Sequence, residues 1–255
     1  MAEYCRTERD GHILVITLDR PKVLNSLNAP ACFELHRIFD DFEADPELWV
    51  AIITGAGERA FCAGHDLADA PDAPMPPSGW AGLAERADRR KPLIAAVNGL
   101  AFGGGFEIAL ASDIVVASHQ AAFAMSEPRV GAVALGGGAQ RLALRLPTAI
   151  AMGLLLTGRR IDAAEAYRWG LVTELAPAQE VLSVARRWAN EILECAPLCV
   201  RFTRELALEA LEGTALPALI GQRSREIAAK LFASEDTPEG IRAFLEKRRP
   251  VWRGR

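Results

Sequence analysis

The stretch KPLIAAVNGLAFGGGFEIALASDI (Lys91–Ile114) decides the fold that the sequence predicts. Its apolar run Leu93–Val97 is typical of a buried strand, and a glycine-rich turn follows this run. The glycines lead directly into a predicted helix over Gly104–Ala111, and a further strand is expected at Ile114–Ala117. This strand–helix–strand order favours an α/β protein with a sheet flanked by helices.

Strand and helix patterns continue to alternate on both sides of this stretch. Ala31–Ala44 carries apolar residues at near-helical spacing with acidic residues between them, which predicts an amphipathic helix. The segment Ala70–Gly79 holds four prolines and almost no large apolar residue, so we expect an exposed loop there. Further strands are expected at Ile13–Leu18, Val50–Thr54 and Leu171–Glu174.

The strand signals end near Pro177. The residues that follow predict only helices, over Ala178–Glu194, Leu198–Leu211, Leu216–Phe232 and Pro238–Lys247. We therefore expect two parts of the chain, a β-rich core of residues 1–177 and a helical C-terminal region of residues 178–255.

The composition limits the class of protein. Of the 255 residues 50% are hydrophobic and 24% charged, and no apolar run approaches the roughly 20 residues that span a bilayer, so no membrane segment is expected. The N-terminal stretch MAEYCRTERDG lacks the apolar part of a signal peptide. The five cysteines are scattered and odd in number, and together these features indicate a reducing, cytoplasmic setting.

The charge pattern argues against a general nucleic-acid binder. The net charge is −4, whereas such proteins present clustered Lys and Arg to phosphates. The exception is the tail 241–255, where six basic residues accompany one acid, so that the tail carries +5 and the rest of the chain −9. A tail of this kind is either a solvated helix face or a surface that receives a few phosphate groups.

Several metal and cofactor motifs are missing from the sequence. It has no H-E-x-x-H and no C-x-x-C pair, and the spacing of Cys195 and Cys199 is typical of helix packing, so no metal site is expected. It also lacks a Walker loop, a G-x-S-x-G motif and the third glycine of a dinucleotide fingerprint. These absences argue against nucleotide-phosphate binding and serine-hydrolase chemistry.

Two glycine-bearing segments follow predicted strands. Phe61–Leu67 (FCAGHDL) comes after the strand that ends at Thr54, and Asn98–Glu107 leads into the predicted helix. Glycines at a helix N-terminus let a ligand approach free backbone N–H groups, which is what an oxyanion hole requires. The alternative is that Gly103–Gly105 only permits tight packing of the helix on the sheet.

Two acidic residues stand among apolar neighbours close to these segments. Glu107 lies in the first turn of the glycine-led helix, between Phe106 and Ile108. Glu127 precedes a second glycine run, Gly136–Gly138. Two such carboxylates can act as acid and base on one water molecule, provided that the fold brings them together.

Six ordered stretches of the sequence carry a family resemblance. They are RPKVLNSLN (Arg20–Asn28), AFCAGHDL (Ala60–Leu67), KPLIAAVNGLAFGGGFEIALASDI (Lys91–Ile114), FAMSEPRVGAVALGGGAQRL (Phe123–Leu142), LTGRRIDAAEAYRWGLVTEL (Leu156–Leu175) and EGIRAFLEKRRP (Glu239–Pro250). Together they resemble the enoyl-CoA hydratase (crotonase) superfamily over nearly the whole chain. The ordered set is far more specific than any one of its members.

The resemblance implies a fold and an assembly. The fold is the crotonase (ClpP-like) α/β fold, in which a spiral of ββα units forms the core and a C-terminal helical region takes part in trimer formation. The same reasoning implies a homo-oligomer, either a trimer or a hexamer built as a dimer of trimers, with no nucleic-acid or membrane partner.

The resemblance also implies a catalytic site. In the family two backbone N–H groups hold the thioester oxygen of an acyl-CoA as it gains enolate character, and by position these belong to His65 and Gly104. Glu107 and Glu127 fall on the positions of the two hydratase glutamates. Glu107 is assigned to the deprotonation of the water that attacks Cβ, and Glu127 to the delivery of a proton to Cα.

The CoA part of the substrate can be placed in the same way. Lys22, Val23 and Leu24 match positions that line the nucleotide, while Phe244 with Lys247 resembles a pair that a neighbouring subunit contributes around the adenine and phosphates. The pantetheine is bordered by Ala63, Gly64, Asp66 and Leu67.

The expected activity is the reversible hydration of a trans-2-enoyl-CoA to a 3-hydroxyacyl-CoA, with no metal and no cofactor besides the acyl-CoA substrate. Alternatives within the superfamily are a carnitinyl-CoA dehydratase or racemase and an enoyl-CoA isomerase. A non-catalytic RNA-binding or interaction protein on the same fold is a third possibility. The acidic body and the two glutamates weigh against this third possibility.

Overall fold

Strand β5, formed by Leu93–Val97, is an inner strand of a six-stranded sheet in the computed structural model of the chain. The structure describes residues 3–70, 73–211, 213, 215 and 218–255. Neighbouring strands of the sheet run parallel except for the N-terminal pair, which is antiparallel. In spatial order the sheet contains β1 (Cys5–Asp10), β2 (Ile13–Leu18), β3 (Val50–Gly55), β5, β7 (Ile114–Ser118) and β10 (Glu174–Ala176).

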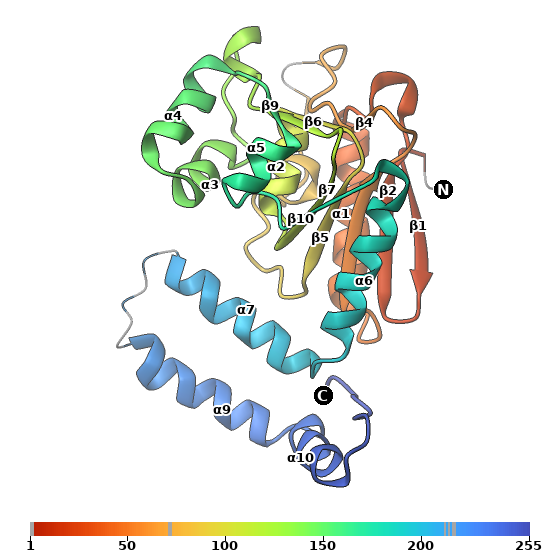
Figure 1. Cartoon of the computed structure of the whole chain (residues 1–255), viewed down its shortest axis with the longest axis vertical. Helices are drawn as coiled ribbons and strands as arrows, with labels where there is room; N and C mark the ends of the chain where they lie inside the picture. The colour runs from red at the N-terminus through yellow and green to blue at the C-terminus, as the bar shows by residue number, and fades with distance from the viewer. Residues whose placement is uncertain (1–2, 71–72, 212, 214, 216–217) are drawn as a thin grey trace.

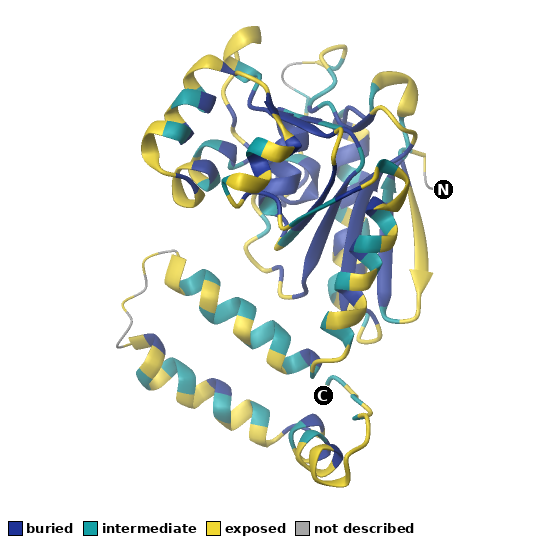
Figure 2. Cartoon of the chain, viewed as in Figure 1, coloured by how far each residue is buried: buried dark blue, intermediate teal, exposed yellow. Residues whose placement is uncertain are grey.

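Four predicted strands of this sheet are confirmed, at β2, β3, β5 and β7. The prediction of a strand over Leu171–Glu174 is wrong in position, because pairing with β7 begins only at Glu174. Leu171 and Val172 instead donate their backbone N–H groups to Ala166 in helix α5 (Ala163–Arg168). The sequence does not predict β1, whose polar side chains lie exposed at the edge of the sheet (Figure 2).

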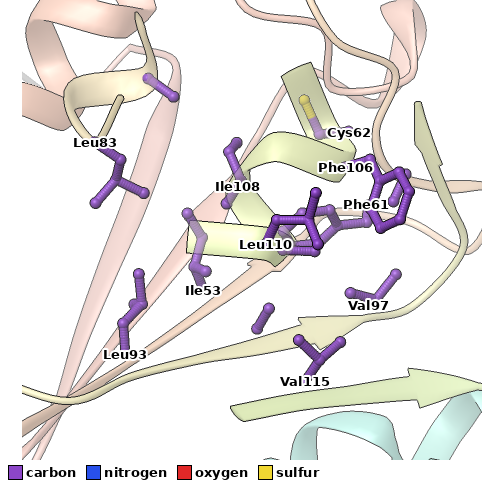
Figure 3. Close-up of a cluster of buried hydrophobic side chains, with 14 of the residues drawn as sticks. Ile53, Phe61, Cys62, Leu83, Leu93, Val97, Phe106, Ile108, Leu110 and Val115 are labelled. Carbon is purple, nitrogen blue, oxygen red and sulfur yellow. The ribbon is translucent and has the colours of Figure 1, made fainter. Parts of the chain in front are cut away.

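Each face of the sheet is covered, which explains why the residues of β3 are all buried. On one face helix α2 (Gly104–Ala111) contributes Phe106 to a cluster that also contains Ile53 of β3 (Figure 3). On the other face helix α6 (Val181–Leu193) covers Ile52 of the same strand. Helix α6 lies beyond residue 177 and nevertheless packs on the sheet (Figure 1).

Helix α1 (Ala29–Ala44) confirms the predicted amphipathic helix and begins two residues earlier than expected. The side chain of Asn28 accepts a hydrogen bond from the backbone N–H of Ala31 and so caps the helix. Leu35 and Phe39 on its apolar face are fully buried in the same cluster as Phe106.

A second, four-stranded sheet lies beside the first (Figure 1). The sequence does not predict its strands, because segments of two or three residues are too short to show a period-2 pattern. In spatial order they are β4 (Ala60–Cys62), β6 (Leu100–Phe102), β8 (Ala122–Ala124) and β9 (Ile161–Asp162).

The two sheets are built by a repeated turn of the chain. Strands β3, β5 and β7 of the first sheet are each followed by a strand of the second, namely β4, β6 and β8. Helix α2 follows β6, and helix α3 (Gly138–Arg145) comes after β8. Because β4, β6 and β8 run parallel, the loops that leave them emerge at the same edge of the second sheet.

The proline-rich segment differs in part from its prediction. Of the segment Ala70–Gly79, residues 71 and 72 lie outside the described part of the chain, and Pro76, Ser78 and Gly79 are buried rather than exposed. The reason is packing on α1, where the hydroxyl of Ser78 lies 2.8 Å from Nδ1 of His36. Pro76, Ser78 and Gly79 therefore belong to the wall of the core, whereas Ala70, Pro74, Met75 and Pro77 are exposed as predicted.

The helices that follow α6 lie apart from both sheets (Figures 1 and 2). The predicted helix Leu216–Phe232 is confirmed from 224 onward, after a π-helical turn at Leu219–Arg223, and residues 216 and 217 lie outside the described part. None of the described helices combines the length and apolar character needed to cross a membrane. The remaining helices are α4 (Thr148–Thr157), α7 (Pro197–Leu211), α9 (Ser224–Phe232) and α10 (Asp236–Glu246).

Candidate active site

The loops after β4, β6 and β8 surround a cavity of about 470 Å³. Its lining combines apolar side chains with a few polar groups, as is usual for small-molecule sites. Four sequence-predicted residues of the catalytic centre lie together in this wall, namely His65, Gly104, Glu107 and Glu127.

Glu107 is only 5% exposed, and its carboxylate faces the glycine run that begins at Gly136. Its Oε1 accepts a hydrogen bond of 2.8 Å from the backbone N–H of Gly138, at the N-terminus of α3. Burial raises the pKa of Glu107 above its usual range, and the Gly138 N–H partly opposes this shift. The nearby negative charge of Glu127 raises the pKa of Glu107 further, and both residues line the same cavity.

Glu127 begins a short 3-10 helix, Glu127–Val130, directly after the β8 segment. Its Oε2 is buried and has no hydrogen-bond partner among the described residues. Burial raises the pKa of Glu127, while its own backbone N–H lowers it. Gly103 lies close beside it, since a Cβ on Gly103 would be 3.1 Å from Oε1 of Glu127. A carboxyl group in this setting retains its proton more readily than an exposed one.

The two predicted oxyanion-hole segments approach each other closely. A Cβ on Gly64 would lie 3.2 Å from the backbone nitrogen of Gly104, and the φ of +96° at Gly64 also favours glycine. Gly103, with φ of +53°, precedes α2 and turns the chain into it. Within the described residues, neither the N–H of His65 nor that of Gly104 donates to a backbone acceptor. Both groups are therefore available to a ligand oxygen.

The loop that carries His65 is fixed by backbone pairing with the segment before α1. Leu27 donates its N–H to the carbonyl of Gly64 at 2.8 Å, and Asp66 donates to the carbonyl of Leu27 at 2.9 Å. Asp66 also forms an ion pair of 2.9 Å with Arg20. Because these contacts hold Gly64 and Asp66, the residues on either side of His65, they also fix the position of the His65 N–H.

The residues predicted to border the pantetheine fall into two groups. Ala63, Gly64 and Leu67 line the cavity, whereas Asp66 faces Arg20 instead. Leu67 is exposed and so lies at the entrance rather than the floor.

The residues predicted to line the nucleotide lie next to this entrance. Lys22 and Val23 are exposed in a 3-10 turn, Pro21–Val23, and do not line the cavity. The carbonyl of Leu24 accepts a hydrogen bond of 3.0 Å from the N–H of Ala63, which ties this turn to the cavity wall.

The structure does not bring Phe244 and Lys247 to the cavity within one chain. Both are exposed at the C-terminal end of α10, far from α2 (Figure 1). Part of the basic charge of the tail is also neutralised, because Glu239 pairs with Arg242 at 2.5 Å and with Arg248 at 2.6 Å.

Three features of the site are not found from the sequence. The run Gly136–Gly138 is noted there, but its contact with Glu107 is not predicted; a Cβ on Gly136 would lie 2.4 Å from Oε2. Arg141 donates to the carbonyl of Gly136 at 2.8 Å and steadies this run. The ring of Trp80 covers Gly104, where a Cβ would lie 2.2 Å from it. The glycine run is the one signal that points to any of them.

The described residues contain no group of three or more His, Cys, Asp and Glu arranged to hold a metal ion. The polar groups that converge on the cavity are instead two carboxyl groups and two backbone N–H groups. Such a set can move protons and stabilise a developing oxyanion on a carbonyl compound.

Comparisons with known proteins agree with this fold. Enoyl-CoA hydratases of Mycobacterium marinum and Mycobacterium tuberculosis H37Rv superpose with a TM-score of 0.92, at 41% and 40% identity, and each match covers 99% of both chains. The sheets and ββα turns described above are thus those of the crotonase fold, as the resemblance implied.

The sequence comparisons extend over the whole length. Carnitinyl-CoA dehydratases of Citrobacter koseri and Escherichia coli K12 are 46% and 45% identical and match 100% of this chain and of their own. The family described as enoyl-CoA hydratase/isomerase matches residues 8–255. The chain belongs to this enoyl-CoA hydratase/isomerase family and is an enzyme of the crotonase family.

Proposed function

We propose that this enzyme is a hydro-lyase that adds water to a trans-2-enoyl-CoA and, in reverse, removes water from a 3-hydroxyacyl-CoA. The observation that carries the proposal is the pair of carboxyl groups, Glu107 and Glu127, facing one cavity beside the N–H groups of His65 and Gly104. A pair of carboxyl groups favours water addition or elimination over a double-bond shift, which needs only one.

The different surroundings of the two carboxyl groups support different roles. Glu107 has the Gly138 N–H and the positive charge of Arg141 to stabilise its anion, so it acts as the base toward water. Oε2 of Glu127 lacks such a partner among the described residues, so this group carries the proton. The assignment follows the general rule that paired groups with different surroundings divide acid and base work.

Hydration then proceeds in one proton-balanced sequence. The N–H groups of His65 and Gly104 hold the thioester oxygen as negative charge develops on it. Water forms a bond to Cβ while Glu107 accepts its proton, and Cα receives a proton from Glu127. The reverse sequence removes water, after which the two carboxyl groups again hold one proton between them.

The second candidate is the dehydration of carnitinyl-CoA. It is favoured by relatives of that name that are 46% and 45% identical over the full length. Both candidates use the same water chemistry and differ only in the acyl group. The cavity residues that contact the acyl group, rather than the two carboxyl groups that handle water, therefore decide between the two candidates.

We also propose that CoA is held between subunits of a homo-oligomer, a trimer or a hexamer. Large apolar side chains that are exposed on the C-terminal helices support this, since apolar surface left uncovered in one chain is typical of an interface. They include Ile220, Phe232, Ile241, Phe244 and Leu245, each at least 60% exposed. In such an assembly Lys247 and Phe244 reach the CoA of a neighbour, while Lys22 of the same chain contacts the nucleotide.

The function is tested with crotonyl-CoA, whose enoyl-thioester absorbance disappears on hydration. We expect the purified protein to remove this absorbance and to form 3-hydroxybutyryl-CoA. Glu127→Gln is expected to lower kcat by at least about 10²-fold, a usual cost of losing an acid–base group. Unchanged turnover in a folded Glu127→Gln protein would remove the proposed role of this residue.

A further inference from the structure

The lining of the catalytic cavity has an uneven charge. Among its described residues are three acids, Glu85, Glu107 and Glu127, and neither lysine nor arginine. Glu107 and Glu127 act in the proposed reaction, whereas Glu85 has no role in it. Because Glu127 is proposed to hold a proton, Glu85 and Glu107 are the anionic groups of this lining, and they attract a cationic acyl group more than an anionic one.

Glu85 is held at the rim of the cavity by its backbone. Its N–H donates to the carbonyl of Ser78 at 2.9 Å, and its Cγ lies only 3.0 Å from where Gly79 would carry a Cβ. Its carboxylate makes no hydrogen bond or ion pair with any described residue. The arginines nearest in sequence pair elsewhere, Arg86 with Asp40 at 2.7 Å and Arg89 with Asp113 at 2.7 Å.

Trp80 supplies an aromatic surface in the same wall. Its indole ring lies against Gly104 so closely that a Cβ there would be 2.2 Å from a ring atom. The ring nitrogen Nε1 is buried and has no hydrogen-bond partner among the described residues. Because Gly104 is the proposed donor to the thioester oxygen, Trp80 lies beside the first carbons of the acyl chain.

We propose that Trp80 and Glu85 form a subsite that selects acyl groups with a quaternary ammonium at Cγ. The inference rests on the proposed function, because the N–H of Gly104 and the two glutamates place the acyl chain. A trimethylammonium group has no N–H to donate, so it is recognised by an aromatic face and a nearby negative charge rather than by hydrogen bonds. Its nitrogen is bonded to Cγ and is therefore two bonds from Cβ, on the side away from the thioester.

Trp80 and Glu85 interact with the ligand in different ways. The indole face attracts the cation through its quadrupole and also contacts its methyl groups. The exposed carboxylate of Glu85 adds a weaker, salt-dependent attraction. The full-length similarity to carnitinyl-CoA dehydratases agrees with a substrate of this charge.

Binding of two unreactive thioesters tests the subsite without any need for turnover. The probes are 4-trimethylammoniobutanoyl-CoA and its neutral isostere 5,5-dimethylhexanoyl-CoA, which differ only by nitrogen against carbon. Calorimetry on the full-length protein is expected to give a Kd at least about fivefold lower for the cation, within the range of a cation–π contact. A preference that weakens with added salt would support the contribution of Glu85.

Variants then assign the preference to residues. Glu85→Gln and Trp80→Phe are each expected to reduce the ratio of the two Kd values by about threefold or more. Asp88→Asn, at an exposed acid three positions along the same segment and outside the cavity lining, is the matched control and keeps the wild-type ratio. Trp80→Phe keeps an aromatic ring, so the wall retains most of its packing.

Two results would overturn the subsite. One is equal affinity of the wild-type protein for the two probes, and the other is an unchanged ratio in both Glu85→Gln and Trp80→Phe. Failure of the proposed function has a different signature, namely a wild-type protein that hydrates neither crotonyl-CoA nor its γ-trimethylammonium derivative. The binding ratio is measured independently of that result.

Discussion

The backbone N–H of Gly138 donates a hydrogen bond to Oε1 of Glu107 across 2.8 Å and 31 residues of sequence. The donor stands at the N-terminus of α3, where the free N–H groups and the helix dipole favour a negative charge. Arg141, one turn further along, holds the carbonyl of Gly136 and lowers the pKa of Glu107. The second glycine run is therefore part of the environment of the carboxylate that we propose as the base.

Replacing Gly136 with alanine is expected to displace the Glu107 carboxylate, because the new Cβ would lie 2.4 Å from Oε2. We expect kcat for crotonyl-CoA hydration to fall at least about tenfold, with KM little changed, since a misplaced catalytic group mainly affects the chemical step. Gly153→Ala is the matched control, because its Cβ would meet nothing within 4 Å. Steady-state kinetics of both variants check this, and a normal kcat in Gly136→Ala would contradict it.

The sequence predicts which residues carry the proposed chemistry but not what surrounds them. Glu107 and Glu127 can be found because acids are unusual among apolar neighbours, and because their segments match a family. The covering of Gly104 by Trp80 cannot be found in this way. It depends on how the segment after the proline run folds across α1, and no local pattern encodes this contact.

The same distinction holds for the fold. Strands β3 and β5 are predictable, because both faces of their sheet are covered and their sequences are continuously apolar. Strands β6 and β8 are not, because three residues carry no periodicity and their pairing is imposed by the longer strands before them. The buried Pro76 and Ser78 show that part of a proline-rich run can pack, here where the hydroxyl of Ser78 forms a hydrogen bond with His36.

Glu107→Gln is expected to make the protein more stable at the expense of activity. Burial raises the folded-state pKa of Glu107, so the folded protein binds this proton more tightly than the unfolded chain. Wild-type stability therefore falls as the pH rises from the ordinary carboxyl range through the raised pKa, and glutamine removes this loss. We expect the Tm difference between variant and wild type to be larger at pH 8 than at pH 5.

Thermal unfolding at both pH values measures this effect, with Glu58→Gln as the control at an exposed acid. The control is expected to show the same small Tm difference at each pH. A Glu107→Gln protein that is less stable than wild type at pH 8 would show that the charged carboxylate stabilises the fold.

Lys247→Asn tests the assignment of the basic tail to CoA. Asparagine tolerates the left-handed backbone at this position, where φ is +53°, so the variant removes charge with little strain. We expect KM for crotonyl-CoA to rise about threefold or more, because a phosphate contact is lost. KM for crotonyl-pantetheine, which has no nucleotide, should stay the same.

Arg168→Asn, on the exposed face of α5, is the control for a lost positive charge outside the tail. An equal rise in KM for both thioesters in Lys247→Asn would place Lys247 elsewhere in the function, as a structural residue of the α10 terminus.

An ion-pair network joins α7 to the core. Asp113, which directly precedes β7, accepts from Arg89 at 2.7 Å and from Arg204 of α7 at 2.9 Å. Burial would raise the pKa of Asp113, but the guanidinium groups of Arg89 and Arg204 and the backbone N–H of Leu93 together outweigh this and lower it. A carboxylate with a depressed folded-state pKa stabilises the fold above its unfolded pKa, and this contribution is lost as the pH falls.

Arg204→Met is expected to loosen α7, since its guanidinium also donates to the carbonyl of Arg89 at 2.5 Å and methionine keeps only the apolar part of the contact. The free energy that holds α7 against the core is expected to fall by about 1–3 kcal/mol, the usual range for a partly buried charged hydrogen bond. Hydrogen exchange should therefore become faster throughout α7 while α2 keeps its protection, and crotonyl-CoA turnover should be nearly retained. Arg168→Met, at an exposed arginine, serves as the control. Unchanged exchange in α7 of Arg204→Met would show that other contacts hold this helix.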